Sequence, residues 1–244
     1  MKRAALIAAA LFALGLPVQA QTQTATPPAA RPNIVVILVD DAGFSDFSAY
    51  GGEARLPPVD AQHASGARFS HYYTSPFCAP SRAMLLTGVD HHRTGVATIP
   101  EVLPPSQVGH RGYTMHLEPG VLTVAQRLQS AGYSTLMTGK WHWGHDAGDL
   151  PNSHGFDRSF ALDASGADNW QDAPYMPYNN YAPWFEDGKP AQLPQDFYSS
   201  RFSVERMIQY LDSDPRQGPF FAYLAFQAVP IPVQAPREYT QHYL

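Results

Sequence analysis

Three apolar runs alternate with segments of helical periodicity along the chain. Residues 34–39 (IVVILV) are continuously apolar and rich in β-branched residues, a pattern typical of a strand buried on both faces of a parallel sheet. Residues 133–137 and 219–226 predict two further strands. Helical spacing predicts one helix that runs from residue 122 to Gly132 and another over 203–214. This alternation of strands and helices predicts an α/β fold with a parallel sheet.

The carboxyl ends of these strands are where a site is expected, because ligands of open α/β sheets bind in the crevice beyond them. The first strand ends at Asp40 and Asp41, and the second leads into TGKWHWG at 138–144. The third leads into QAVPIP at 227–232. Residues 143–195, dense in aromatic and turn residues, predict a loop-rich region.

The first twenty residues have the plan of a secretory signal peptide. Lys2 and Arg3 precede an apolar run too short for a membrane span, and VQA at 18–20 resembles a cleavage site. Residues 21–31 predict an unstructured lead-in. No second long apolar stretch follows, so we expect a secreted or periplasmic protein with no membrane span.

The charge balance argues against nucleic acid as a partner. The 16 lysines and arginines include Lys2 and Arg3, so 14 remain against 21 acidic residues, a net charge of −7. Nucleic acid and anionic membranes both require a basic face. A local cationic pocket for a small anion remains compatible with this balance. A hydrophobic fraction of 44% with 13 Tyr and 13 Phe indicates a globular core.

Asp40 and Asp41 are adjacent carboxylates at a strand end. Neighbouring carboxylates repel each other, and their desolvation is costly unless a cation joins them. A hard divalent ion such as Ca²⁺ or Mg²⁺ fits such oxygen ligands. The alternative is that one acid caps the next turn while the other is solvated.

Cys78 is the one cysteine of the chain, so it has no partner for an internal disulfide. Pro80 suits the first turn of a helix that Gly88 would end, and Arg82 follows Cys78 by four positions. The helix dipole and the guanidinium favour a thiolate or a bound anion there. The alternative is a packed cysteine with Arg82 in a surface ion pair.

Lys140 and His142 stand two positions apart after the second strand. If the extended conformation persists, their side chains face the same way. A lysine can hold an anion, and a histidine can move protons near neutral pH. The alternative is a structural histidine. A functional role is favoured because all three candidate sites, Asp40-Asp41, Cys78 and Lys140-His142, fall at predicted strand ends or helix starts.

Six segments in this order resemble the N-terminal part of the sulfatase family, especially the arylsulfatases: PNIVVILVDD, CAPSR, LLTG, HHRTG, AGYSTLMTGKWHWG and GFDRSF. The resemblance extends from about Pro32 to Pro236. It implies an α/β fold of the alkaline-phosphatase and sulfatase type, with a mostly parallel mixed sheet flanked by helices. Residues 32–244 would then be an incomplete, truncated N-terminal part of the catalytic domain.

The resemblance implies a sulfuric ester hydrolase that acts on small-molecule sulfate esters. In sulfatases the cysteine of C-x-P-S-R is oxidised by formylglycine-generating machinery to formylglycine, an aldehyde. Its hydrate attacks sulfur, the alcohol leaves, and loss of sulfate regenerates the aldehyde. Cys78 would be the precursor of this nucleophile.

Each site residue then receives a role from the resemblance. Asp40, Asp41 and converted Cys78 would bind the metal ion, usually Ca²⁺ and less often Mg²⁺. Arg82 would hold the hydrate, Lys140 would bind a sulfate oxygen, and His142 would accept the proton that lets sulfate leave. Asn169 is assigned with Lys140 to substrate binding. Trp170 stands after it, where many relatives have His, and concerns substrate choice only.

Two departures from the family pattern bear on activity. Pro230 occupies the position where arylsulfatases have a histidine that helps to protonate the leaving group. The distal half of a sulfatase, with an Asp-Asn pair for the metal and a further sulfate-binding lysine, does not follow Leu244, so a fragment is expected. A phosphate or phosphonate monoester hydrolase on the same fold and a catalytically inactive sulfatase fragment therefore stand as alternatives.

Overall fold

The computed structural model describes residues 30–175, 182–229 and 231–244. The chain divides into two units, Met1–Arg31 and Pro32–Leu244. The predicted signal peptide, most of the predicted lead-in and Pro230 lie outside the described residues. All helices and strands given below belong to the second unit.

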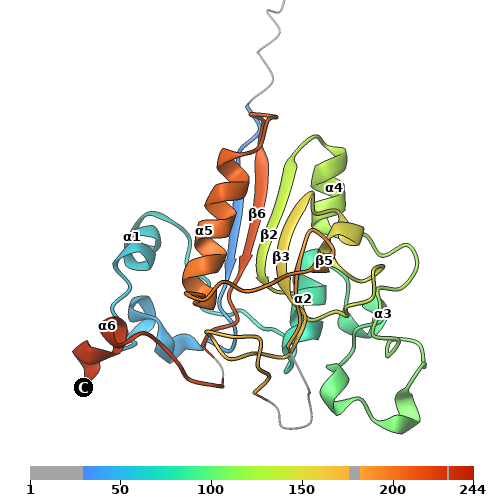
Figure 1. Ribbon diagram of the computed structural model, residues 1–244, viewed down its shortest axis with the longest axis horizontal. Helices are drawn as coiled ribbons and strands as arrows, with labels where there is room; N and C mark the ends of the chain where they lie inside the picture. The colour runs from blue at the N-terminus through green and yellow to red at the C-terminus, as the bar shows by residue number, and fades with distance from the viewer. Residues whose placement is uncertain (1–29, 176–181, 230) are drawn as a thin grey trace, which may run out of the picture. The chain divides into compact units, whose positions relative to one another are not determined.

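A six-stranded sheet with the order β1-β6-β2-β3-β4-β5 forms the centre of this unit (Figure 1). The first four strands in this order are parallel, whereas β4 runs antiparallel to β3 and β5 antiparallel to β4. The predicted mostly parallel mixed sheet is therefore confirmed. The strands are β1 Ile34–Leu38, β2 Ser134–Lys140, β3 Arg158–Leu162, β4 Trp184–Glu186, β5 Lys189–Pro190 and β6 Phe220–Ala225.

Helices cover both faces of the sheet, with α2 and α4 on one face and α5 on the other (Figure 1). The α-helices are α1 Pro57–Ser65, α2 Cys78–Thr87, α3 His91–Thr94, α4 Val124–Ser130, α5 Ser199–Asp212 and α6 Arg237–Thr240. Short 3₁₀ turns are η1 Phe44–Asp46, η2 Ser48–Tyr50, η3 Pro100–Val102, η4 Pro105–Gln107, η5 Pro151–His154 and η6 Gln241–Tyr243. Among the described residues, no helix has the length and apolar character needed to cross a membrane.

Alternate residues of the central strands belong to two separate hydrophobic cores, because successive side chains of a strand point to opposite faces of the sheet. Met137 of β2 and Tyr223 of β6 pack with α2 and α4. Leu136 of β2 and Ala222 of β6 pack on the opposite face with α5. Every residue of β2 is buried, which holds its carboxyl end rigidly in the sheet.

The first strand departs from its prediction. β1 pairs only with β6 and forms one edge of the sheet. Ile34, Val36 and Leu38 pack against the core beside α2, but Val35 is 57% exposed and Ile37 56% exposed. The prediction of a strand buried on both faces is therefore wrong in this unit, since α5 packs against β2, β6 and β3 and leaves that face of β1 uncovered.

The other predicted elements are found with shifted ends. The helix expected over 122–132 is α4, and its capping box joins Thr123 and Gln126. The strand predicted at 133–137 continues to Lys140, because pairing with β6 and β3 extends it past Thr138. The helix at 203–214 begins earlier, at Ser199. The loop-rich interpretation of 143–195 missed β3, β4 and β5, which are short and complete their hydrogen bonds only through the sheet.

Candidate active site

The nucleophile candidate Cys78 is the first residue of α2, and Pro80 occupies the first turn of that helix as predicted. Gly88 ends α2 in the left-handed conformation, with φ at 68°. The indole Nε1 of Trp143, which follows β2, donates a hydrogen bond of 3.2 Å to the carbonyl of Ala79. This contact ties the start of α2 to the carboxyl end of the sheet.

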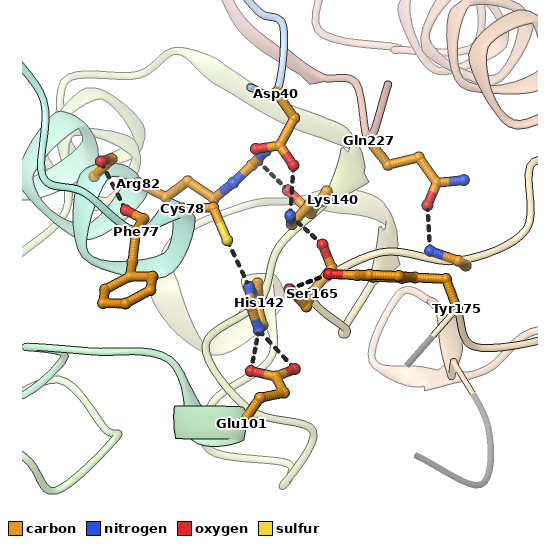
Figure 2. A network of polar contacts seen from close by, with 12 residues as sticks. Asp40, Phe77, Cys78, Arg82, Glu101, Lys140, His142, Ser165, Tyr175 and Gln227 are labelled. Atoms are coloured by element: carbon orange, nitrogen blue, oxygen red, sulfur yellow. Dashed lines mark hydrogen bonds and ion pairs between the residues drawn. The ribbon is translucent and has the colours of Figure 1, made fainter. Parts of the chain in front are cut away.

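The side chains of Cys78, His142 and Glu101 contact one another in this order (Figure 2). The Sγ atom of Cys78 lies 3.2 Å from Nδ1 of His142. On the other side of the ring, both carboxylate oxygens of Glu101 lie 3.3 Å from Nε2. The side chains of His142 and Glu101 are only 3% and 7% exposed, so water screens these contacts little.

The extended conformation does not continue past Lys140. His142 has a φ of 68°, in the left-handed region. Consequently Lys140 and His142 do not face the same way: Lys140 points to Asp40, and His142 points to Cys78 (Figure 2). The condition on which both side chains were expected to face the same way is therefore not met, although both residues remain at the same end of β2.

Asp40 sits between two buried cations at the carboxyl edge. Its Oδ1 accepts a hydrogen bond of 2.9 Å from Nη2 of Arg82, and its Oδ2 accepts one of 2.5 Å from Nζ of Lys140. The side chains of Arg82, Lys140 and Asp40 are 2%, 1% and 5% exposed. Lys140 also donates to the carbonyl of Ser165. The Asp40 carboxylate therefore compensates part of the positive charge of Arg82 and Lys140.

Arg82 is held by further contacts. Its Nη1 donates to the carbonyl of Lys140 at 2.7 Å and lies 3.4 Å from the hydroxyl of Tyr223. Arg82 is therefore a buried component of the site, and the alternative of a surface ion pair is wrong. Its Nε has no hydrogen-bond partner among the described residues although it is buried. A buried N–H without an acceptor is costly, so this donor suits an oxygen atom brought by a ligand or by a modified side chain.

These contacts shift the acidities of the site. Burial raises the pKa of the Asp40 carboxyl, but the charges and hydrogen bonds of Arg82 and Lys140 outweigh it, and the pKa lies below its usual value. Burial likewise raises the pKa of the Cys78 thiol, yet the hydrogen bond and charge of His142 and the charge of Lys140 lower it to about 7. The thiol is thus far more acidic than an ordinary cysteine.

His142 and Glu101 are shifted in opposite directions. Burial lowers the pKa of His142, but its hydrogen bonds with Cys78 and Glu101 raise it above the usual value. Burial raises the pKa of Glu101, whereas the hydrogen bond and charge of His142 hold it below the usual range. Glu101 is therefore ionised at neutral pH.

The predicted metal ligands are placed differently from each other. Asp40 is buried, whereas Asp41 is exposed and has a φ of 54°, in the left-handed region. Asp40 and Asp41, adjacent in the chain, offer the hard oxygen donors that Ca²⁺ or Mg²⁺ requires. Because Ca²⁺ takes about 6–8 oxygen ligands, Asp40 and Asp41 fit such an ion as part of its coordination shell.

Asn169 lies in a buried polar network near the ends of β3 and β6. Its Oδ1 accepts hydrogen bonds from Oγ of Ser199 at 2.6 Å and from Nε2 of Gln227 at 3.1 Å. Oε1 of Gln227 accepts from the backbone N–H of Ala167 at 2.9 Å. A role of Asn169 in substrate binding stays a prediction. Trp170, which follows it, is 41% exposed.

Sequence reasoning missed Glu101 and Tyr223 as parts of the site. Glu101 lies in η3, in a loop whose sequence gives no periodic signal, and 41 positions separate it from His142. Tyr223 lies within the third predicted strand, where a hydroxyl among apolar residues is the one signal that could have drawn attention. Both meet the site only through the folded sheet.

The fold and site define an α/β protein with an acidic thiol beside buried charged side chains at the carboxyl edge of a mostly parallel sheet. A sequence profile of the sulfatase family, described as Sulfatase, matches residues 32–243. The chain therefore belongs to the sulfatase family.

Curated relatives agree with this assignment. The chain is 40% identical over 215 residues to an arylsulfatase of Klebsiella aerogenes, a match that covers 87% of this chain and 46% of the relative. It is 33% identical over 236 residues to arylsulfatase J of Mus musculus, covering 93% of this chain and 37% of the relative. The chain thus spans less than half of the length of these relatives.

A solved structure supports the fold. The crystal structure of Ps i-CgsB matches with a TM-score of 0.71 and 29% sequence identity, covering 85% of this chain and 47% of that chain. The similarity confirms the predicted sulfatase-like α/β fold over most of the second unit.

Proposed function

We propose that the protein is a sulfuric ester hydrolase of the arylsulfatase kind, with a nucleophile derived from Cys78. The observation that carries the proposal is the position of Cys78 at the start of α2, 3.2 Å from His142 and beside the buried cations Arg82 and Lys140. A nucleophile, a proton carrier and two cations are what attack on an anionic ester requires. The two relatives named as arylsulfatases support sulfate as the anion.

Two groups that the resemblance implies would complete the site. A formylglycine formed from Cys78 would supply the attacking hydroxyl, and a divalent ion, Ca²⁺ rather than Mg²⁺, would stabilise developing negative charge. Asp40 and Asp41 would hold the ion together with residue 78. The buried Nε of Arg82, which has no hydrogen-bond partner among the described residues, supports an additional oxygen acceptor in the completed site.

Lys140 and Arg82 would orient the substrate and the nucleophile. Lys140 lies at the buried end of β2 and donates a hydrogen bond to Asp40. An ammonium group has three N–H donors, so Lys140 can also donate to a sulfate oxygen. Arg82 is fixed from two sides by the Lys140 carbonyl and by Asp40, so its guanidinium presents the same face to every substrate.

His142 would carry the proton. Its Nδ1 is the ring atom that faces residue 78, so a hydroxyl on that residue can transfer its proton to Nδ1 as sulfate departs. The ring is nearly fully buried, which keeps bulk water from competing for this proton.

Export is part of the proposal. The order of Lys2, Arg3, the apolar run and VQA supports a secreted or periplasmic location, with a small-molecule sulfate ester as substrate and formylglycine-generating machinery as the modifying partner.

The test is sulfate release by the full-length protein, produced together with formylglycine-generating machinery and assayed on an aryl sulfate and on the matching aryl phosphate. We expect sulfate release that Cys78→Ala abolishes, and a peptide across position 78 whose mass shows the aldehyde. Activity that survives Cys78→Ala would refute the nucleophile. Release of phosphate in preference to sulfate would favour a phosphate or phosphonate monoesterase, and an unmodified, inactive protein would identify a silent fragment.

A further inference from the structure

We propose that Glu101 is a positioning residue that fixes the tautomer and the orientation of His142, so that the lone pair of Nδ1 is directed at residue 78. The expected effect on turnover rests on the proposed function. The geometry of Glu101 and His142 does not depend on that function.

The first support is the placement of the carboxylate. Both oxygens of Glu101 lie 3.3 Å from Nε2 of His142, and its side chain is 7% exposed. The 3₁₀ turn η3 carries it, and backbone bonds of 3.3 Å from Val102 to Ile99 and from Leu103 to Pro100 close the turn. Because its carboxylate is buried and its turn is closed by hydrogen bonds, Glu101 has less conformational freedom beside His142 than a surface glutamate has.

The second support is the proton count of the ring. An ionised carboxylate can only accept hydrogen bonds, so the contact with Glu101 requires a hydrogen on Nε2. A neutral imidazole carries one N–H, and Nδ1 is then left as an acceptor. Nδ1 is the atom that faces residue 78, so this tautomer is the one able to receive a proton from a hydroxyl there.

The third support is the charge around His142. Two buried cations, Arg82 and Lys140, already share the carboxylate of Asp40. Glu101 lies on the far side of the ring from Cys78, so its negative charge faces His142 from the side opposite to residue 78. Figure 2 shows the order Cys78, His142, Glu101 clearly.

The first experiment measures steady-state kinetics of the full-length, converted and metal-loaded enzyme. Glu101→Gln keeps the size of the side chain but removes its charge and lets an amide donate to Nε2, which favours the wrong tautomer. We expect kcat to fall about 100-fold with KM changed less than about threefold. Glu101→Asp should restore part of kcat. Glu205→Gln, an exposed glutamate of α5, is the matched control and should behave as wild type.

A double-mutant cycle tests whether Glu101 acts through His142. In a His142→Gln background, Glu101→Gln should reduce kcat by less than about threefold further, since the residue it positions is gone. An equal loss in both backgrounds would overturn the inference, as would a wild-type kcat for Glu101→Gln in an enzyme that releases sulfate.

A second readout is independent of turnover. Nitrogen NMR of the histidine rings in a Cys78→Ala protein, at a pH where His142 is neutral, reports which ring nitrogen carries the hydrogen. His142→Gln assigns the signal. We expect hydrogen on Nε2, and a mixture of tautomers in Glu101→Gln. A tautomer that is unchanged in Glu101→Gln would overturn the inference, whether or not the wild-type protein releases sulfate. A wild-type protein that releases no sulfate would refute the proposed function and would leave this test of the tautomer valid.

Discussion

The Sγ atom of Cys78 and the Nδ1 atom of His142 lie 3.2 Å apart, although 64 positions separate the two residues in the sequence. The contact joins the start of α2 to the loop after β2. It makes the residue that begins the helix chemically different from an ordinary buried cysteine. The acidity of the thiol can therefore be measured on protein in which Cys78 is still a thiol.

We predict that unconverted Cys78 reacts with iodoacetamide at a rate that reaches half its plateau near pH 7. The thiolate is the reactive form, so the rate rises as the pH passes upward through this pKa. Since Cys78 is the one cysteine of the chain, the alkylated mass reports it directly. His142→Gln removes the stabilising partner and should move the midpoint to higher pH. A midpoint that stays near pH 7 in this variant would contradict the assignment of cause.

Asp40 and Asp41 should differ sharply in their contribution to stability. Asp40→Asn leaves Arg82 and Lys140 buried without their carboxylate, and we expect a loss of about 3–5 kcal/mol in the free energy of unfolding. Asp41→Asn changes an exposed side chain and should stay within about 0.5 kcal/mol of wild type. Urea unfolding in the presence of a chelator measures both, because the metal then contributes nothing. Equal losses would refute the structural role of Asp40.

Calcium should reveal the second role of this pair. At a Ca²⁺ concentration of about 100 times its Kd, binding stabilises the folded protein by about 2.7 kcal/mol. We expect this gain for the full-length wild-type protein and its loss or strong reduction in Asp41→Asn, whose stability without metal is normal. Thermal unfolding with and without Ca²⁺ is the measurement, and Mg²⁺ serves as the comparison ion. An unchanged gain in Asp41→Asn would remove this residue from the metal site.

Gly139 should tolerate no side chain. It lies in β2 with a φ of 102°, and a Cβ atom there would meet the carbonyl oxygen of Ala225 at 1.9 Å. Gly139→Ala therefore forces β2 and β6 apart just before Lys140. Gly88→Ala is the matched control, since φ is 68° and no atom lies within 4 Å of the added carbon.

The control variant should cost about 1–2 kcal/mol from left-handed strain alone. We expect Gly139→Ala to cost at least about 2 kcal/mol more than that, because overpacking adds to the strain. Urea unfolding measures the difference. Equal costs in the two variants would show that the strands absorb the added methyl group.

Local sequence determined the start of α2 and the chemical groups at the strand ends. Pro80 in the first turn and Gly88 at the end of the helix act through their own backbone preferences, which depend on no distant contact. The rule that ligands bind beyond the carboxyl ends of strands predicted that Asp40, Lys140 and His142 lie at one edge of the sheet. Each strand end could be located because the apolar run that predicts it is local in the chain.

The tertiary structure alone decided which of these groups meet. The crossover order of the strands places β6 between β1 and β2, which sets β1 at the edge and leaves Ile37 exposed. The same order brings Asp40 to Lys140, across 100 positions of sequence. Glu101 reaches His142 from an aperiodic loop. Periodicity reports only which face of an element is apolar, so partners supplied by another segment are fixed only when the sheet forms.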